Sequence, residues 1–306
     1  MLSFAVRRFL QAIPTLLVLS SLAFFVMRLA PGNPFSDERA FPKQILANIE
    51  AKYGLDAPLY QQYGRYMKNL LKGDLGPSFR YRDFSVNDLV EQAFPVSMRI
   101  GLWAFGVAVI LGISIGVLAA LKQNSWVDHW LMLFAMIGVV IPNFIKAPLM
   151  ILIFAVEFQW FPPGGWCNGS WENLVLPVTA LAISYVSRIA RLTRSSMIEV
   201  LHTNFIRTAK AKGLPMYYIA WKHALRPALL PVMAYLGPVF VGVITGSVVI
   251  ETVFGLPGLG RHFVNGAMNR DYSLVLSLTV IVGTLTTLFT AVVDILSAWI
   301  DPRIRY

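Results

Sequence analysis

The sequence predicts an all-α, polytopic membrane protein with six transmembrane helices, and three observations lead to this prediction. Hydrophobic residues make up 56% of the chain and charged residues only 14%, whereas a soluble domain has about 25% charged residues. Apolar segments recur that can cross a hydrocarbon core about 30 Å thick, which needs about twenty residues. Lysine and arginine gather in alternate connecting segments and near both ends of the chain. Both ends then lie on the same side of the membrane, which requires an even number of spans.

The apolar segments lie near residues 9–29, 97–121, 130–156, 174–194, 228–250 and 274–300. The first could imitate a secretory signal, because Arg7 and Arg8 precede it. Its length and the lack of a small-residue cleavage site favour a retained span instead. The fourth is the weakest, since Arg188 and Arg191 already lie at its C-terminal end.

The distribution of basic residues predicts the orientation. If the N-terminus is cytoplasmic, the cytoplasmic segments hold many bases and few acids. These bases are Arg7, Arg8, Lys122, Arg188, Arg191, Arg194, Arg207, Lys210, Lys212, Lys222, Arg226, Arg303 and Arg305. The segments 30–96, 157–173 and 251–272 have no excess of basic residues. By the positive-inside rule, both termini are cytoplasmic, and this rule also explains the net charge of +10 without nucleic acid.

The chain then divides into three parts. Residues 1–29 form the cytoplasmic N-terminus and first span, residues 30–96 an extracytoplasmic helical segment, and residues 97–306 a five-helix core with a cytoplasmic loop at 195–227. In the second part, "PKQILANIEAKYGL" and "PLYQQYGRYMKNLLKGDLG" show the spacing of short amphipathic helices. Its tyrosines, such as Tyr53, Tyr60, Tyr63 and Tyr66, indicate either an external docking surface or an aromatic belt at the membrane.

Small residues and prolines inside the spans predict how the helices pack. Gly112 with Gly116, and Gly242 with Gly246, have the small-xxx-small spacing that lets another helix approach closely. Prolines can kink membrane helices, either for ordinary packing or for a gate. They are Pro14, Pro142, Pro148, Pro177 and Pro238.

Three ionisable residues, Lys146, Glu157 and Asp294, are expected at or near membrane depth. Such residues are costly there and are functional candidates. Asp294 either lines a path or pairs with a base of a partner helix. Lys146 either extends its amine to the interface or faces a wet cavity.

Enzyme signatures are missing from the sequence. The four histidines form no HExxH motif, and "GLPGLGRHF" at 255–263 lacks the spacing and the Lys-Ser/Thr pair of a P-loop. The single cysteine, Cys167, cannot form an internal disulfide. We therefore expect no catalytic residue, no metal site and no cofactor on this chain, so that any active transport draws energy from a partner or an ion gradient.

The segment "TNFIRTAKAKGLPMYYIAWKHALRPALLP", residues 203–231, is basic and has no acidic residue. Its first part predicts a short helix that ends at Gly213, with Pro215 just beyond as a stop. A second amphipathic part leads back to the membrane, so the segment forms a helix–turn–helix in which Ala209 and Gly213 allow close packing. The alternative is a basic helix lying on anionic lipid.

This segment resembles the cytoplasmic loop of ABC-importer permeases, known for a Glu-Ala-Ala…Gly pattern. Ala209 and Gly213 match the pattern, and Arg207-Thr208-Ala209 stands where Glu-Ala-Ala is usual, as in the peptide-importer branch. The whole chain is similar to the peptide/nickel permease group, and within it to oligopeptide-permease B subunits. The resemblance rests on "RRFLQAIPTLLVL", "FVMRLAPGNPF", "GDLGPSF", "RTAKAKGL", "HALRPALLP", "GSVVIETVFGLPGLG", "NRDYSLVLSLT" and "DPRIRY", in this order.

The resemblance implies a type I ABC-importer permease core in the bacterial plasma (inner) membrane. It implies a heterodimer with a second, homologous permease, two ABC ATPase subunits that bind ATP and Mg, and an extracytoplasmic oligopeptide-binding protein that delivers peptide. A dipeptide, nickel or glutathione permease of the same group is an alternative, and a stand-alone secondary transporter is another. The segment 30–96 and the loop 255–271 are expected to contact the binding protein.

The resemblance also proposes roles for individual residues. The expected ATPase-coupling residues are Phe205, Ile206, Arg207, Ala209, Lys210, Ala211, Gly213 and Leu214. Polar residues near the fifth span are expected along the substrate pathway, namely Tyr235, Thr245, Ser247 and Glu251.

Overall fold

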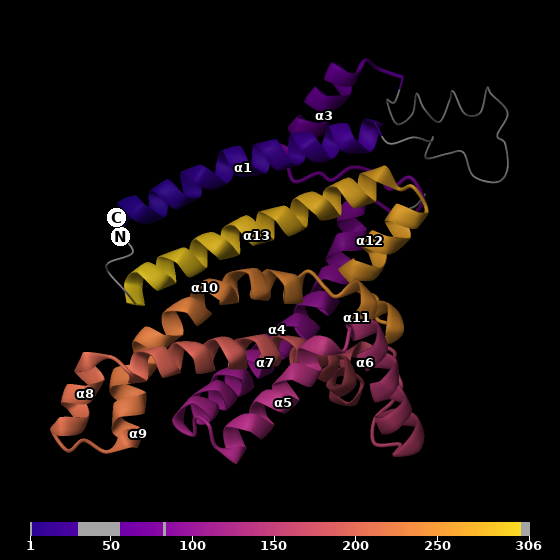
Figure 1. The fold of residues 1–306 in the computed structure, drawn as a ribbon. Helices are drawn as coiled ribbons and strands as arrows, with labels where there is room; N and C mark the ends of the chain where they lie inside the picture. Colours follow the sequence, from indigo (N-terminus) through magenta and orange to yellow (C-terminus); the bar gives the residue numbers. More distant parts are fainter. Residues whose placement is uncertain (1, 30–55, 82–83, 301–306) are drawn as a thin grey trace.

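The computed structural model describes residues 2–29, 56–81 and 84–300, and helices make up the regular structure of these residues (Figure 1). The helices are α1 (Leu2–Leu29), α3 (Leu59–Leu71), α4 (Val86–Leu121), α5 (Trp126–Val140), α6 (Asn143–Met150), α7 (Trp171–Leu201), α8 (Asn204–Ala211), α9 (Met216–Tyr218), α10 (Leu225–Ile244), α11 (Val248–Val253), α12 (Leu259–Met268) and α13 (Tyr272–Ile300). Two π-helical segments, Ile151–Glu157 and Ile219–Ala224, continue α6 and α9, and a 3-10 turn covers Cys167–Gly169.

Five helical segments are long and apolar enough to cross a membrane. A sixth span results if Trp126–Val140 and Asn143–Glu157 are counted together, although the two helices meet at 105°. The predicted number of six is reached in this way, and the apolar segment expected at 130–156 is two helices that meet at one of the prolines expected to kink a span. The break falls at Pro142, whose missing N–H and fixed backbone interrupt the helix.

Lys146 stabilises this break. The carbonyl of Gly138 would normally accept the N–H of residue 142, and Pro142 has none. The Lys146 ammonium donates to the Gly138 carbonyl oxygen at 2.9 Å and also to the hydroxyl of Ser184. Lys146 is buried within the chain, and both of these partners belong to the chain itself. It caps the C-terminal end of α5, where a positive charge is favourable.

We predict that Lys146→Met lowers the free energy of unfolding by about 1–3 kcal/mol, because the Gly138 carbonyl is left buried without a donor. Thermal unfolding of the detergent-purified chain measures the effect. The matched control is Lys122→Met, since Lys122 is an exposed lysine at the end of α4. Equal stability of the two variants would show that the ammonium does not hold the break.

The centre of the bundle is α7, the helix that was expected to be the weakest span. Its most apolar window is 61% buried, more than in any other candidate span of the described residues. It packs along α4 at Gly112 and Gly116, where an added Cβ would lie 2.7 Å from the Ile189 Cβ and 2.6 Å from the Ala190 carbonyl oxygen. The first small-residue pair is therefore confirmed as a site of close helix packing.

The second small-residue pair does not have this role within the chain. Gly246 lies beyond the end of α10, in a turn with φ +88°, and its hydrogen atoms face the carboxylate of Glu251. A Cβ on Gly242 would meet only the Tyr185 hydroxyl, at 3.3 Å. Within this chain the pair provides no close helix approach, because the helix ends before the second glycine.

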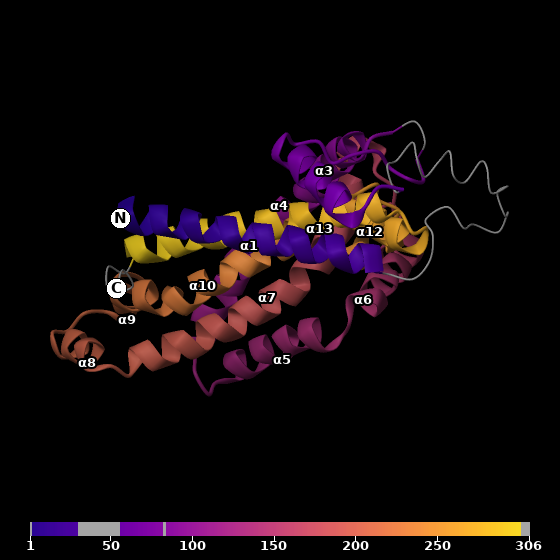
Figure 2. The same ribbon diagram turned by 90° about the horizontal axis from the view of Figure 1, so that it is seen from above.

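The ends of the helices sort to two sides of the molecule. The N-terminal end of α1, the C-terminal end of α13 and the α8–α9 region lie at one end, whereas α3, α6 and α12 lie at the other (Figures 1 and 2). This arrangement agrees with the predicted common side of the first span, the last span and the basic segment. Asp294 of α13 forms an ion pair with Arg8 of α1, with 3.3 Å between the carboxylate and Nε, which confirms pairing with a base on another helix.

The described part of the segment 30–96 confirms one expected helix, α3. Tyr63 and Tyr66 of α3 stack on Phe25 and Phe24 at the end of α1, so these tyrosines face the chain itself. The expected helix at 42–55 lies outside the described residues. The second span starts earlier than expected, because Ser85 caps α4 through a capping box with Asp88. Glu157 is exposed at the end of its π-helical segment.

Candidate functional site

The basic segment forms a helix, a tight turn and a second helix, as predicted. Gly213 adopts φ +76°, a backbone conformation that residues other than glycine rarely adopt. The Gly213 amide donates to the Lys210 carbonyl at 2.9 Å and the Leu214 amide to the Ala209 carbonyl at 3.4 Å. This pair of bonds is a Schellman motif, and Pro215 then caps α9. The turn is therefore fixed by local sequence.

One face of α8 is buried against the bundle. Ile206 is fully buried and Ala209 nearly so. They belong to a buried apolar cluster that also draws on α4, α7, the π-helical segment 219–224 and α10. The other buried members are Ala120, Met197, Leu201, Ile219, Ala220, Ala224 and Ala228. Half-buried Leu214 packs on the same cluster. Ile206 and Ala209 thus anchor α8 on its own chain, and the contact of α8 with an ATPase subunit stays a prediction.

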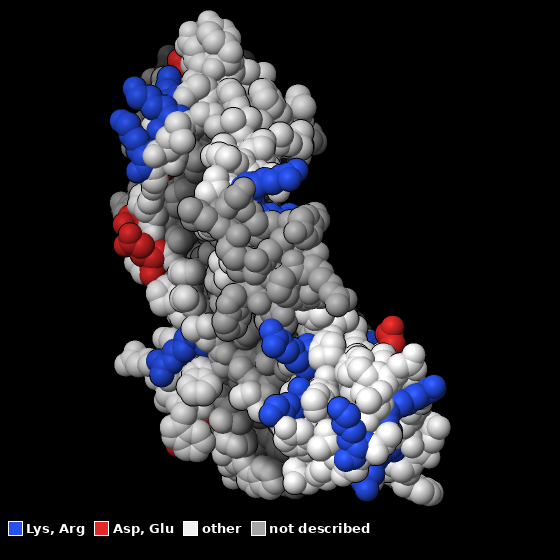
Figure 3. All heavy atoms as spheres, turned by 90° about the vertical axis from the view of Figure 1, so that its left-hand side faces the viewer, with Lys and Arg blue, Asp and Glu red and all other residues white. Residues whose placement is uncertain are grey.

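The other face of α8 and its turn is open and cationic. We define the coupling surface as Phe205, Arg207, Lys210, Ala211, Gly213, Tyr217 and Trp221, all of them exposed. Basic side chains gather over this end of the molecule, at the lower right of Figure 3. Nothing lies within 4 Å of the Cβ position of Gly213. Exposed aromatic rings and arginine are typical of the centres of protein interfaces, and this surface can accept a partner that is both acidic and apolar.

An ion pair that the sequence did not reveal connects α7 to α5. Arg194 of α7 donates to Asp128 of α5 from Nε and Nη2, both at 2.6 Å, and Asp128 is buried. This bidentate geometry is the strong form of the interaction. It ties the start of α5 to the helix that leads into α8. The two residues are 66 positions apart in the sequence, so their pairing could not be predicted from local sequence.

The structure places the four expected pathway residues on α10, on the turn that follows it and on α11. Tyr235 is half-buried on α10, and Thr245 and Ser247 flank the turn after that helix. The Thr245 hydroxyl donates to the Val241 carbonyl at 2.8 Å, and Ser247 caps α11. These three residues keep partly exposed surfaces, so a role along a pathway stays a prediction for them.

Glu251 has a different place from the one expected. It is only 2% exposed. Its carboxylate accepts from the Ser97 hydroxyl at 2.7 Å and from the Arg261 amide at 3.1 Å, while Ser97 accepts from the Leu259 amide at 2.8 Å. Glu251 thus joins α11, α4 and the start of α12 from inside the chain, and it does not line an open surface in this structure.

Comparison with known proteins agrees with this architecture. The family model described as "binding-protein-dependent transport system inner membrane component" matches residues 112–306. The model for the N-terminal part of the membrane component of such systems matches residues 1–100. The chain belongs to this family. It is therefore a multi-pass permease subunit of an ABC importer, a transport component that works with other subunits.

Curated permeases of this family are similar over their whole length. The oligopeptide transport system permease protein OppB of Haemophilus influenzae is 63% identical over 100% of both chains. OppB of Escherichia coli K12 is 61% identical with the same coverage. The dipeptide transport system permease protein DppB of Bacillus subtilis is 43% identical, over 100% of this chain and 98% of DppB.

The fold of this permease is also that of solved importers. Inward-facing structures of the MetNI methionine ABC transporter match with a TM-score of 0.59 and 18% identity, over 70% of this chain and 96% of the other. A second crystal form matches with a TM-score of 0.54. At this identity the likeness concerns the fold alone, and it shows a type I ABC-importer permease core.

Proposed function

We propose that this chain is the permease subunit of an ATP-driven importer that takes up oligopeptides delivered by an extracytoplasmic binding protein. The observation that carries the proposal is the 63% identity to an oligopeptide permease across the full length of both chains. Dipeptide cargo is the second candidate, since a dipeptide permease is 43% identical. The higher identity favours oligopeptides.

The proposed complex contains a second, homologous permease and two ABC ATPase subunits. Those ATPases bind ATP and Mg on the cytoplasmic side, where both termini of this chain lie by the distribution of its basic residues. The peptide-binding protein docks on the outer side, and the pathway runs between the two permeases. Tyr235, Thr245 and Ser247 remain its candidates on this chain.

The coupling surface links ATP hydrolysis to transport in this proposal. Closure of the ATPase pair displaces α8, and the buried side chains of Ile206 and Ala209 pass the displacement to the ends of α4, α7 and α10. ATP binding therefore shifts the balance between two states of the spans, because the open and closed forms of the ATPase pair contact α8 differently.

Reconstitution tests the function. The chain, its second permease, the ATPases and the binding protein are placed in liposomes, and uptake of labelled peptides of two to six residues is measured with and without ATP. We expect uptake only with ATP and all subunits, and faster uptake of the longer peptides. Equal uptake by this chain alone would instead show a stand-alone transporter, and uptake restricted to dipeptides would identify the second candidate.

We predict that the double change Arg207→Glu and Lys210→Glu reduces co-purification of the ATPase subunits at least about tenfold, a loss of about 1.4 kcal/mol or more in binding free energy. Both side chains are exposed on α8, so the chain itself should still fold and insert. Lys122→Glu, at the exposed end of α4, is the control for a charge change outside the coupling surface. Retained ATPase binding with lost membrane association would favour the lipid-bound helix.

A further inference from the structure

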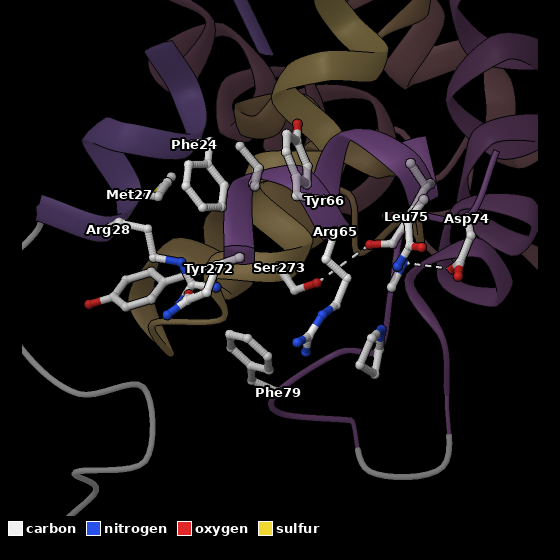
Figure 4. A pocket seen from close by; sticks show the side chains of 15 residues that line it. Phe24, Met27, Arg28, Arg65, Tyr66, Asp74, Leu75, Phe79, Tyr272 and Ser273 are labelled. Carbon is white, nitrogen blue, oxygen red and sulfur yellow. Dashed lines mark hydrogen bonds between the residues drawn. The ribbon is translucent and has the colours of Figure 1, made fainter. Parts of the chain in front are cut away.

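A small cavity of about 130 Å³ lies at the end of the molecule opposite α8. Its walls come from the end of α1, from α3, from the segment that follows α3, and from the start of α13 (Figure 4). Phe24, Arg28, Arg65, Tyr66, Phe79 and Tyr272 are among the residues that line it. The site therefore combines two guanidinium groups with aromatic rings.

Neither guanidinium is neutralised within the described part of the chain. Arg28 lies over the ring of Phe24, with 5.5 Å to the ring centroid, and Arg65 is exposed. Neither forms an ion pair with a described carboxylate. Asp74 also lines the cavity, and its Oδ1 accepts from the Gly76 amide at 2.9 Å, so the two arginines and this carboxylate leave the lining with a net positive charge. Charges beside apolar walls attract a counter-ion more strongly than charges in water.

The walls of the cavity are held in place by buried contacts. Asp271 is fully buried, and its carboxylate accepts from the hydroxyl of Ser78 and from the Phe79 amide at 3.2 Å. It also caps α13 through the Leu274 amide at 3.2 Å. On the opposite wall, Phe24 is 2% exposed and stacks on Tyr66. The two arginines are thus presented by a preformed frame.

We propose that this pocket receives one carboxylate side chain, an aspartate or glutamate, from the extracytoplasmic binding protein when it docks. The proposal rests on the proposed function and deepens it. Pockets for drug-sized ligands measure about 300–1,000 Å³, so this cavity of about 130 Å³ suits a single side chain and not an oligopeptide. The planar guanidinium matches a carboxylate. Arg28 and Tyr272 lie at the ends of the candidate spans Val6–Leu29 and Tyr272–Ile295, and residues 56–81, which supply α3 and one wall, contain no candidate span. The pocket therefore lies at the ends of these spans, where a docking protein can reach it, and a protein partner is favoured over a lipid.

The experiment uses the assembled importer in nanodiscs of zwitterionic lipid, with the peptide-loaded binding protein as titrant. We expect Arg65→Gln and Arg28→Gln each to raise about tenfold the concentration of binding protein that half-maximally stimulates ATP hydrolysis. The unstimulated rate should stay unchanged. Lys68→Gln removes the same charge from the exposed part of α3 and does not line the pocket, so it should change the value less than about twofold. Arg65→Glu should be rescued by one Asp→Arg or Glu→Arg change in the binding protein.

Three results would overturn the proposal. The first is a half-maximal concentration that is the same for wild type and both arginine variants. The defect could occur only when anionic lipid is added, which would assign the pocket to a lipid phosphate. The variants could instead alter the dependence on peptide at saturating binding protein, which would assign it to the carboxylate of the cargo. Failure of the proposed function itself is distinguishable, because the wild-type importer would then show no ATP-dependent peptide uptake.

Discussion

Replacing Gly116 by alanine is expected to lower the free energy of unfolding by about 1–3 kcal/mol, because the site has no room for a methyl group. The added Cβ would lie 2.5 Å from the Thr193 Cβ and 2.6 Å from the Ala190 carbonyl oxygen. The second of these atoms belongs to the backbone of α7, which cannot move without disturbing the centre of the bundle. Gly116→Leu should prevent α4 from packing on α7 at all.

Gly106 provides the matched control on the same helix. Nothing lies within 4 Å of its Cβ position, so Gly106→Ala should be neutral, or stabilising by up to about 1 kcal/mol through helix propensity. Thermal unfolding and the yield of monodisperse protein in detergent compare the variants. If both alanine variants behave alike, the close approach of α4 and α7 does not limit stability.

Replacing Glu251 by leucine is expected to cost about 3 kcal/mol or more, since it leaves several buried donors without an acceptor. Ser97 and the Arg261 amide both donate to this carboxylate. Glu251→Gln keeps the shape and one acceptor, so its cost should be smaller, about 1–2 kcal/mol. The expected order of stability is wild type, then glutamine, then leucine.

Thermal unfolding and limited proteolysis of the segment 255–261 measure this effect. Thr252→Ala is the control, because Thr252 is the next residue of α11 and is exposed, and exposed substitutions usually change stability by less than about 0.5 kcal/mol. A leucine variant that is as stable as wild type but defective in transport would contradict this structural role and support a role of Glu251 along the substrate pathway.

Features set by neighbouring residues could be predicted from the sequence. The turn after α8 follows from Gly213 and Pro215, and the confirmed close packing at Gly112 and Gly116 follows from their spacing on one helix face. The broken third span could not be predicted from hydropathy, because its apolar residues continue on both sides of Pro142. What distinguishes a break from a kink here is Lys146, whose partner Ser184 belongs to another helix.

The roles of polar residues were harder to predict, because they depend on partners far away in the sequence. Glu251 was placed on the pathway as a polar residue near a span, yet its hydroxyl donor is Ser97 of α4. Asp128 gave no clear signal because its partner is Arg194. For α8, composition indicated an amphipathic helix, but the direction of Ile206 and Ala209 became clear only with the cluster that surrounds them.

The seating of α8 has a consequence for how the chain does mechanical work. Ile206 is enclosed by residues from α4, α7 and the approach to α10, and the Schellman turn leaves no loose connection behind it. Under the proposed function, force that an ATPase subunit applies to α8 would therefore pass directly to these neighbouring spans and tilt them together.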